Sequence, residues 1–178
     1  MASVAILVNG LPGSGKTTVS ATLAGVLGCP LLAVDPVQEA LADLAGPMIA
    51  PQAVRRIAVE AVWAMAGEVE AGVVVDAGWQ RDRDLDGVRA GVGQAGSPRV
   101  LEVWCDAAPE LALARSVARV EGGGRHPVHG TAAELADGWA DRAAAAGPLD
   151  AWPVVRVDTS GGEVDVDALV MEISAHFV

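Results

Sequence analysis

The sequence is poor in several residue types, and each shortage narrows what the protein can be. Tyrosine is absent, while phenylalanine, lysine and asparagine occur once each. Two cysteines, Cys29 and Cys105, cannot form a dense disulfide framework or a four-cysteine zinc site. We therefore expect two buried thiols and a reducing compartment.

Long hydrophobic runs are missing as well. Charged residues, glycine or proline interrupt every run before it reaches the ~20 apolar residues of a membrane span. The run from Val4 to Val8 is too short for a signal-peptide core, and Met1-Ala2-Ser3 contains no basic residue. From these features we expect a soluble cytoplasmic protein without a membrane partner.

Positive charge is scarce too. The formal net charge is −11, with 12 Lys and Arg against 23 Asp and Glu. Nucleic-acid backbones and anionic membrane surfaces repel such a chain, so neither is an expected partner. A small anionic ligand stays open, because local hydrogen-bond donors can override the net charge.

What is present suffices for one well-packed domain. The 178 residues are 52% hydrophobic and 20% charged, which excludes a disordered chain and predicts a single domain over residues 1–178. Short apolar runs predict buried strands at 4–8, 31–34, 73–76, 100–104 and 154–157. Helical patterns fill 17–27, 36 onward, 51 to about 70, 109–120, 132–146 and 164–176. This alternation predicts an α/β fold with a parallel sheet.

The helix that opens at Pro51 carries apolar residues at helical spacing, which predicts that they face inward. These residues are Val54, Ile57, Ala61, Met65 and Val69. Trp63 lies about half a turn away from them, on the side of Arg56. We expect this helix to cover something on two of its faces.

A glycine-rich loop motif gives the strongest chemical signal. Gly10 to Thr17 match G-x-x-x-x-G-K-[ST], between a predicted strand and a predicted helix. The backbone of such a loop wraps a phosphate closely, Lys16 reaches the β- and γ-phosphates, and the Thr17 hydroxyl is a Mg²⁺ ligand. The predicted nucleotide-binding residues here are Gly13, Ser14, Gly15, Lys16, Thr17 and Thr18.

With this motif in place, the chain resembles small P-loop kinases of the shikimate kinase, gluconate kinase and chloramphenicol phosphotransferase group. The resemblance covers nearly the whole length, but only the loop motif is highly specific. It implies a P-loop NTPase fold, in which helices flank a five-stranded parallel sheet of order 2-3-1-4-5. It also implies a short lid at about residues 121–131 and an acceptor-binding helical region at about residues 36–70.

Two aspartates follow predicted strands at the edge where ligands bind in such sheets. The resemblance implies that Asp35 accepts or orients the acceptor hydroxyl and that Asp76, in a Walker B-like pattern, binds Mg²⁺. A helix cap before Pro36 and a strand-ending turn are the respective alternatives. Shikimate kinases carry a D-x-D pair here, whereas this chain has Ala33 at the first position, so its metal must be organised from elsewhere.

Two arginines, Arg115 and Arg119, precede the glycine-rich segment that begins at Glu121, and Arg125 lies within it. The resemblance implies that Arg115 stacks on adenine and that Arg125, as a catalytic lid residue, and Arg119 close over the phosphates. The alternative is a solvated helix face that pairs with nearby glutamates. Thr159 follows the last strand, where the backbone of similar kinases contacts adenine; turn chemistry explains it equally well.

The acceptor region is the least specific part of the sequence. Arginines, tryptophans and a glutamine gather around the predicted ends of the second and third strands. We predict acceptor-binding roles for Asp35, Arg56, Trp63, Trp79 and Arg83. The alternative is that these are ordinary surface arginines and core tryptophans. An arginine suits an anionic acceptor, whereas a tryptophan suits an apolar or ring-shaped one.

Together these features predict an ATP-dependent kinase that uses Mg²⁺ and phosphorylates a hydroxyl of a small metabolite, nucleoside, sugar or antibiotic. A P-loop ATPase or accessory protein without an acceptor, and a nucleotide-sugar kinase of zeta-toxin type, are the alternatives. A GTP-binding switch is excluded, because Asn9 and Lys16 are the sole asparagine and lysine and cannot form N-K-x-D. The acceptor and the oligomeric state stay open.

Overall fold

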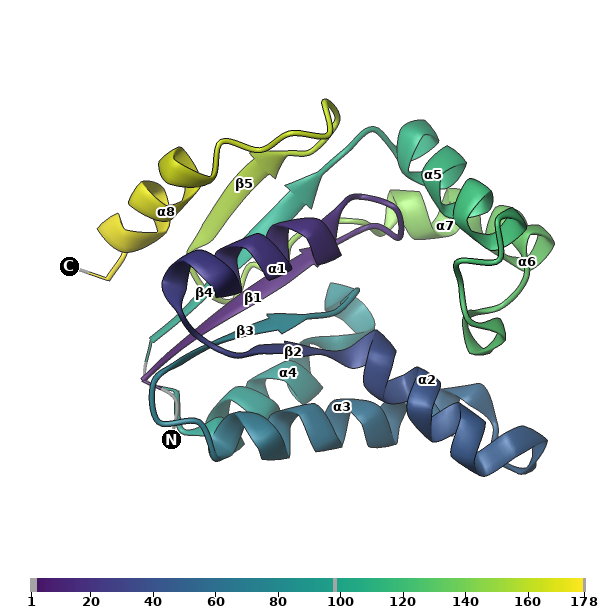
Figure 1. The fold of residues 1–178 in the computed structure, drawn as a ribbon, viewed down its shortest axis with the longest axis horizontal. Coiled ribbons are helices and arrows are strands. Elements are labelled where there is room, and N and C mark those ends of the chain that lie inside the picture. The colour runs from purple at the N-terminus through teal and green to yellow at the C-terminus, as the bar shows by residue number, and fades with distance from the viewer. Residues whose placement is uncertain (1–2, 98, 178) are drawn as a thin grey trace.

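The protein is built on a parallel β-sheet in a computed structural model that describes residues 3–97 and 99–177. Its strands are β1 Val4–Gly10, β2 Leu31–Ala33, β3 Gly72–Asp76, β4 Arg99–Asp106 and β5 Val154–Asp158. They pair in parallel in the order β2-β3-β1-β4-β5 (Figure 1). The predicted fold class and strand order are thus confirmed.

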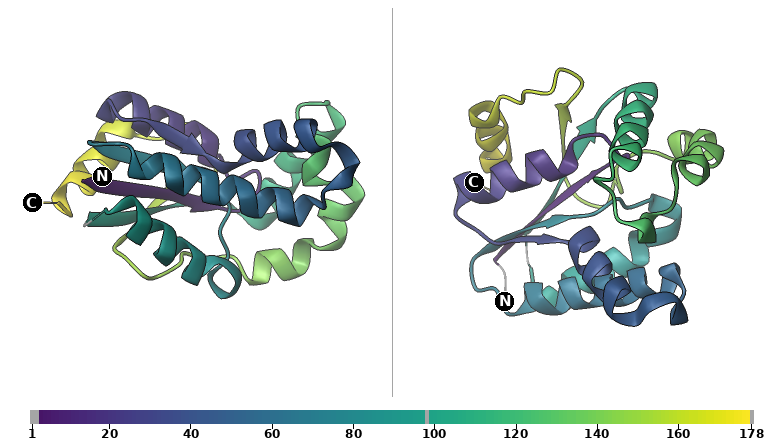
Figure 2. Two further views of the ribbon diagram at one scale, coloured as in Figure 1. Left: turned by 90° about the horizontal axis from the view of Figure 1, so that it is seen from below. Right: turned by 45° about the vertical axis from the view of Figure 1, so that its right-hand side comes forward.

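Helices cover both faces of the sheet (Figure 2). On one face lie α1 Lys16–Leu27 and α8 Val166–Ala175, which bury Leu23 and Ile173 against the strands. On the other lie α3 Pro51–Gly67 and α4 Arg81–Ala95, which bury Val62 and Val88. A hydrophobic core thus covers each face of the sheet, and because the strands are parallel, their carboxyl ends share one edge.

The remaining helices gather around that carboxyl edge. They are α2 Val34–Ala45, η1 Gly46–Met48, α5 Pro109–Glu121, η2 Pro127–His129, α6 Ala132–Asp137 and α7 Trp139–Ala144. Figure 1 shows the loop between α5 and α6 turning toward α2, and η2 in this loop contacts α2. Within residues 3–97 and 99–177, no helix has both the length and the apolarity to cross a membrane.

The buried face of α3 differs from the predicted one. The buried residues follow a four-residue spacing: Val54, Ala58, Val62 and Ala66. Trp63, next to Val62, is buried as well. Ile57 and Met65, which were predicted to face inward, are 37% and 42% exposed. The buried face of α3 therefore combines apolar side chains with two small alanines.

The helix α4 was not predicted at all. Its charged first half and three glycines weaken the apolar pattern that marks a helix. The packing explains one of these glycines: a Cβ at position 91 would overlap the indole ring of Trp63, so only Gly91 fits there. The predicted helix 132–146 is instead two short helices, α6 and α7, which meet at Gly138.

Candidate active site

The loop between β1 and α1 has the shape its sequence predicts for phosphate binding. Gly13 and Gly15 adopt φ of 78° and 85°, which favours glycine. A Cβ at Gly13 would also overlap the Ala112 carbonyl oxygen in α5, so the loop packs tightly there. Within the described chain, the N–H groups of Gly13, Gly15, Lys16 and Thr17 donate to no acceptor and are available for an anion.

Lys16 lies folded against this loop. Its Nζ donates a hydrogen bond to the Leu11 carbonyl oxygen over 2.9 Å. Burial lowers the pKa of Lys16, and the negative charges of Asp76 and Asp35 oppose that shift. A bound phosphate would also stabilise the ammonium, so the site favours an anion next to Lys16.

Asp76 ends β3 at the same edge. It is 6% exposed, and its Oδ2 accepts a hydrogen bond from Ser20 Oγ over 3.0 Å. Burial raises the pKa of Asp76, whereas Lys16 and the hydroxyls of Ser20 and Thr17 lower it. The Asp76 carboxylate and the Thr17 hydroxyl therefore supply neighbouring oxygen donors, which fit a Mg²⁺ ion that also binds phosphate oxygens.

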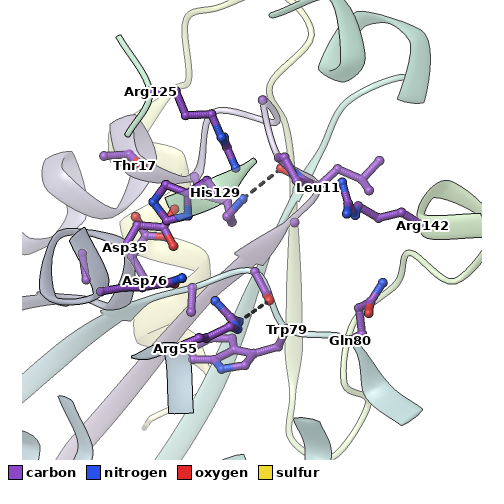
Figure 3. Close-up of a pocket in the computed structure, with 18 of the residues that line it drawn as sticks. Leu11, Thr17, Asp35, Arg55, Asp76, Trp79, Gln80, Arg125, His129 and Arg142 are labelled. Atoms are coloured by element: carbon purple, nitrogen blue, oxygen red, sulfur yellow. Dashed lines mark hydrogen bonds between the residues drawn. The ribbon is translucent and has the colours of Figure 1, made fainter. Parts of the chain in front are cut away.

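A cavity of about 530 Å³ opens beside this loop, among α2, α3, α7, the β3–α4 loop and the α5–α6 loop (Figure 3). This volume lies in the range of small-molecule sites. Three acidic residues line it, namely Asp35, Glu39 and Asp76. Six basic residues line it, namely Lys16, Arg55, Arg83, Arg119, Arg125 and Arg142. The cavity wall is thus cationic although the whole chain carries −11.

Asp35 occupies a different element from the one expected. The helix α2 begins at Val34, so Asp35 lies in the first helical turn rather than at the end of a strand. A carboxylate is favourable there because it faces the positive end of the helix dipole. Burial lowers the pKa values of Lys16, Arg55 and Arg125, and the charge of Asp35 opposes each shift. Asp35 therefore lies in the field of all three cations.

Two residues predicted to bind the acceptor do not reach the cavity. Arg56 projects into solvent and pairs with Glu60 over 2.8 Å. Trp63 is 2% exposed and packs on Gly91 in the core. Neither residue lines the cavity, so the prediction for both is wrong.

Arg55 replaces its neighbour Arg56 at the cavity wall. Its Nη2 donates to the Gly78 carbonyl oxygen over 2.9 Å, and burial lowers its pKa, with Arg83 acting in the same direction. Trp79 and Arg83, which were predicted to bind the acceptor, do line the cavity. Figure 3 shows Arg55 and Trp79 at one end of the cavity and Arg142 across from Asp35.

The residues predicted to contact adenine come together on the other side of the phosphate loop. Arg115 donates to the carbonyl oxygens of Thr159 and Ser160 over 3.1 and 2.9 Å. A Cβ at Gly15 would lie 3.6 Å from the Thr159 side chain. The Thr159 hydroxyl and N–H both donate to the Asp106 carbonyl oxygen, so Thr159 is held within the protein on this side of the loop. Thr18 is exposed in the first turns of α1.

Sequence reasoning missed a buried polar network beneath the loop. The Asn9 side-chain oxygen accepts from the N–H groups of Gly10 and Trp79 over 2.8 and 3.0 Å. Its amide nitrogen donates to Glu102 over 2.9 Å, and Glu102 also accepts from the Leu149 N–H. Asn9 thus links the phosphate loop to the β3–α4 loop. The only feature of the sequence that marked this residue was that the chain has a single asparagine.

Arg142, Glu39 and His129 were also missed as cavity residues. Arg142 belongs to the second of the two short helices, and within the described chain it forms no ion pair. No motif surrounds it in the sequence. The chain has 11 arginines, so composition gave no reason to select this one.

The sheet order, the phosphate loop and the cavity at the carboxyl edge define a P-loop nucleotide-binding fold. Residues 6–144 match the family described as AAA domain, and the chain belongs to that family. No curated protein sequence matches the chain.

Solved structures share the fold. A candidate kinase from Chloroflexus aurantiacus has a TM-score of 0.82 at 24% identity, with 98% of both chains covered. A gluconokinase from Sinorhizobium meliloti has a TM-score of 0.61 at 19% identity, with 98% of this chain and 91% of that one covered. A shikimate kinase from Bacteroides thetaiotaomicron has a TM-score of 0.56 at 16% identity, with 97% of each covered. The chain therefore has the fold of small P-loop kinases.

Proposed function

We propose that the protein is an ATP-dependent kinase that phosphorylates a hydroxyl group of a small anionic acceptor. The observation that carries this proposal is the position of Asp35. Its carboxylate lines the same cavity as the P-loop lysine, in the field of Lys16, Arg55 and Arg125. A carboxylate so placed is a suitable group to orient and deprotonate an acceptor hydroxyl beside the phosphate loop.

The nucleotide would lie across the phosphate loop. The free N–H groups of the loop and Lys16 suit the β- and γ-phosphates, and Arg115 with the Thr159 loop suits the base. Thr17 and Asp76 would hold a Mg²⁺ ion, which neutralises phosphate charge when bound. Arg119 and Arg125 line the cavity from the lid side, where they suit the charge on the transferred group.

In the proposed transfer, Asp35 takes the proton from the acceptor hydroxyl as its oxygen attacks the γ-phosphorus. A bond forms between that oxygen and phosphorus, the bond to the β–γ bridging oxygen breaks, and ADP leaves with the electron pair. Lys16 and Arg125 stabilise the negative charge during this step. Positioning and charge stabilisation supply most of the rate in such reactions.

The anionic character of the acceptor follows from the cavity wall beyond Asp35. Arg55, Arg83 and Arg142 line that part of the cavity, and burial lowers the pKa values of Arg55 and Arg142. Arg83 is already paired with Asp84, whereas Arg142 has no carboxylate partner in the described chain. Cations that lose hydration without gaining a counter-ion favour a ligand that brings one. A carboxylate or phosphate on the acceptor supplies that charge.

A screen of acceptor pools tests the proposal. ADP release from Mg-ATP is measured with pools of hydroxy acids and sugar phosphates and with matched pools of neutral polyols, and Lys16→Ala serves as the blank. We expect the anionic pools to accelerate ADP release and to yield a product about 80 Da heavier, the mass of one phosphoryl group. ADP release that no pool changes, yet the blank abolishes, would indicate an ATPase without an acceptor and overturn the proposal.

The variant Asp35→Asn tests the proposed base directly. It keeps the size of the side chain but removes the proton acceptor, so we expect turnover to fall by about 10²–10⁴-fold with ATP affinity nearly unchanged. Turnover is measured with the acceptor that the screen identifies, and ATP affinity by titration calorimetry. Unchanged turnover would remove Asp35 from the mechanism.

A further inference from the structure

The lid and the helix α2 are joined by two histidine–carboxylate contacts. His129 Nε2 lies 2.9 Å from Glu39 Oε1, and His126 Nε2 lies 3.0 Å from Asp43 Oδ1. The partners are separated by 90 and 83 residues in the chain, so only the fold brings them together. Two of the three histidines of the protein take part in this contact.

The carboxylates form a regular row on α2. Asp35, Glu39 and Asp43 follow one another at four-residue spacing, which places them along one face of the helix. Asp35 lies at the reaction end of this row, and the other two meet the lid histidines. The helix that carries the proposed base therefore also carries the docking points of the lid.

Arg125 lies next to these contacts. It is adjacent in sequence to His126 and lines the cavity together with His129. Burial lowers its pKa, while the charges of Asp35 and Glu39 oppose that shift, so both carboxylates lie near its guanidinium. Figure 3 shows Arg125, His129 and Asp35 around the same part of the cavity. The position of Arg125 over the phosphate loop thus depends on how the lid is held.

The two contacts differ in burial. The side chains of His129 and Glu39 are 8% and 38% exposed, whereas those of His126 and Asp43 are 24% and 76% exposed, so the inner pair is less exposed to solvent than the outer pair. A pair of exposed groups contributes little, whereas one shielded from water contributes more. The Glu39–His129 contact is therefore the stronger of the two.

The lid backbone is shaped to present both histidines. His126 Nδ1 accepts a hydrogen bond from the Val128 N–H over 3.1 Å, which leaves Nε2 as the nitrogen that carries the proton toward Asp43 in the neutral ring. Gly123 and Gly130, at φ of 70° and 86°, flank the segment.

We propose that Glu39 and Asp43 are positioning residues that hold Arg125 over the phosphate loop through their contacts with His129 and His126. The two contacts together are called the clasp. The inference rests on the proposed function. Because the clasp lies on the same helix as Asp35, it links the side of the cavity that receives the acceptor to the lid that covers the nucleotide. Binding on one side of the cavity then favours binding on the other.

Affinity for the non-hydrolysable analogue Mg-AMP-PNP, measured by calorimetry, tests the clasp without knowledge of the acceptor. We expect Glu39→Gln, which replaces the charged acceptor by a neutral one, and His129→Ala, which removes the ring, to weaken binding about five- to tenfold, in the range of typical coupling between sites. His129→Gln should restore most of the loss, because its amide can still donate to Glu39. Glu70→Gln, an exposed carboxylate that precedes β3 at the opposite end of that strand, is the matched control and should bind as the wild type does.

A second background separates positioning from general destabilisation. In Arg125→Ala the group to be positioned is absent, so adding Glu39→Gln should weaken AMP-PNP binding no further. Hydrogen exchange of the lid peptide, recorded without nucleotide, should be faster in Glu39→Gln than in Glu70→Gln. An equal further loss in the Arg125→Ala background, or unchanged lid exchange, would overturn the proposal.

The clasp and the proposed function fail in different ways. If the wild type does not bind AMP-PNP, the proposed ATP-dependent function is wrong, and the proposed coupling, which depends on it, is wrong too. If the wild type binds AMP-PNP and Glu39→Gln binds equally well, the coupling alone is overturned. ¹⁵N shifts of the imidazole of His126 give an independent check, because a proton on Nδ1 at neutral pH would contradict the arrangement of the lid.

Discussion

Replacing Asn9 tests whether the buried network under the phosphate loop holds the site together. Asn9 is fully buried and makes three hydrogen bonds, to the N–H groups of Gly10 and Trp79 and to the Glu102 carboxylate. Asn9→Ala removes all three and leaves a small void. No other described side chain bridges the phosphate loop and the β3–α4 loop in this way.

The size of the effect follows from these bonds. Each bond between neutral groups contributes about 0.5–1.5 kcal/mol, and the bond to the carboxylate about 1.5–3 kcal/mol. We therefore expect Asn9→Ala to lower the free energy of unfolding by about 2.5–6 kcal/mol, a large part of the stability of a domain this size. AMP-PNP affinity should fall as well, because the loop loses its anchor.

The loss should depend on pH. Burial raises the pKa of Glu102, and the Asn9 and Leu149 donors oppose that shift. Without Asn9 the pKa rises further, so the contribution of Glu102 is present below its ordinary pKa and is lost as the pH rises through the folded value. Asn9→Ala should therefore be more destabilising at pH 8 than at pH 5.

Urea unfolding at the two pH values measures both effects. Asn9→Asp is the companion variant, because it keeps the acceptor for Gly10 and Trp79 but sets a second carboxylate against Glu102. It should approach wild-type stability as the pH falls and one of the two carboxylates is protonated. A loss below about 1 kcal/mol for Asn9→Ala, or no pH dependence in Asn9→Asp, would refute the role of the network.

Three further predictions follow from packing and charge. Arg142→Ala should raise the KM for the acceptor about 10- to 100-fold with little change in the KM for ATP. The acceptor KM of Arg142→Lys should lie between those of the wild type and Arg142→Ala. Equal changes in the two KM values would contradict an acceptor contact. Gly91→Ala should destabilise the protein to urea by about 1–3 kcal/mol by overlapping Trp63, whereas Gly93→Ala, in open space on the same helix, should not. Burial raises the pKa of Cys105 to about 12. In native protein at pH 8, iodoacetamide should therefore alkylate Cys105 about a thousandfold more slowly than an ordinary thiol. Alkylation at the ordinary rate would show that the thiol is accessible to solvent.

The helix α3 illustrates why hydrophobic periodicity did not predict which of its faces is buried. Apolar residues occur on several sides of this helix, so more than one inward face satisfies the pattern. The face that was selected places alanines against neighbouring elements and Trp63 against Gly91. That choice depends on a glycine in α4, a helix whose own pattern was too weak to predict.

Arg55 and Arg56 illustrate the same point at the site. Consecutive helical residues point about 100° apart, so only one of two adjacent arginines can face a given cavity. Nothing in the sequence distinguishes the two, and Arg56, which was predicted, lies outside the cavity. Once α3 had docked through Val54 and Ala58, Arg55 was the residue directed toward Gly78.

The sequence by itself determined the phosphate loop, the strand order implied by the family resemblance, and the position of Asp76 after a buried strand. The phosphate loop and the position of Asp76 depend on residues close together in the chain, so local spacing carries them, whereas the strand order came only from the resemblance. Tertiary structure alone decided the cationic cavity wall, the Asn9 network and the histidine–carboxylate contacts between α2 and the α5–α6 loop. They join residues from separate elements, up to 93 positions apart, and only packing of the two sheet faces sets which side chains meet.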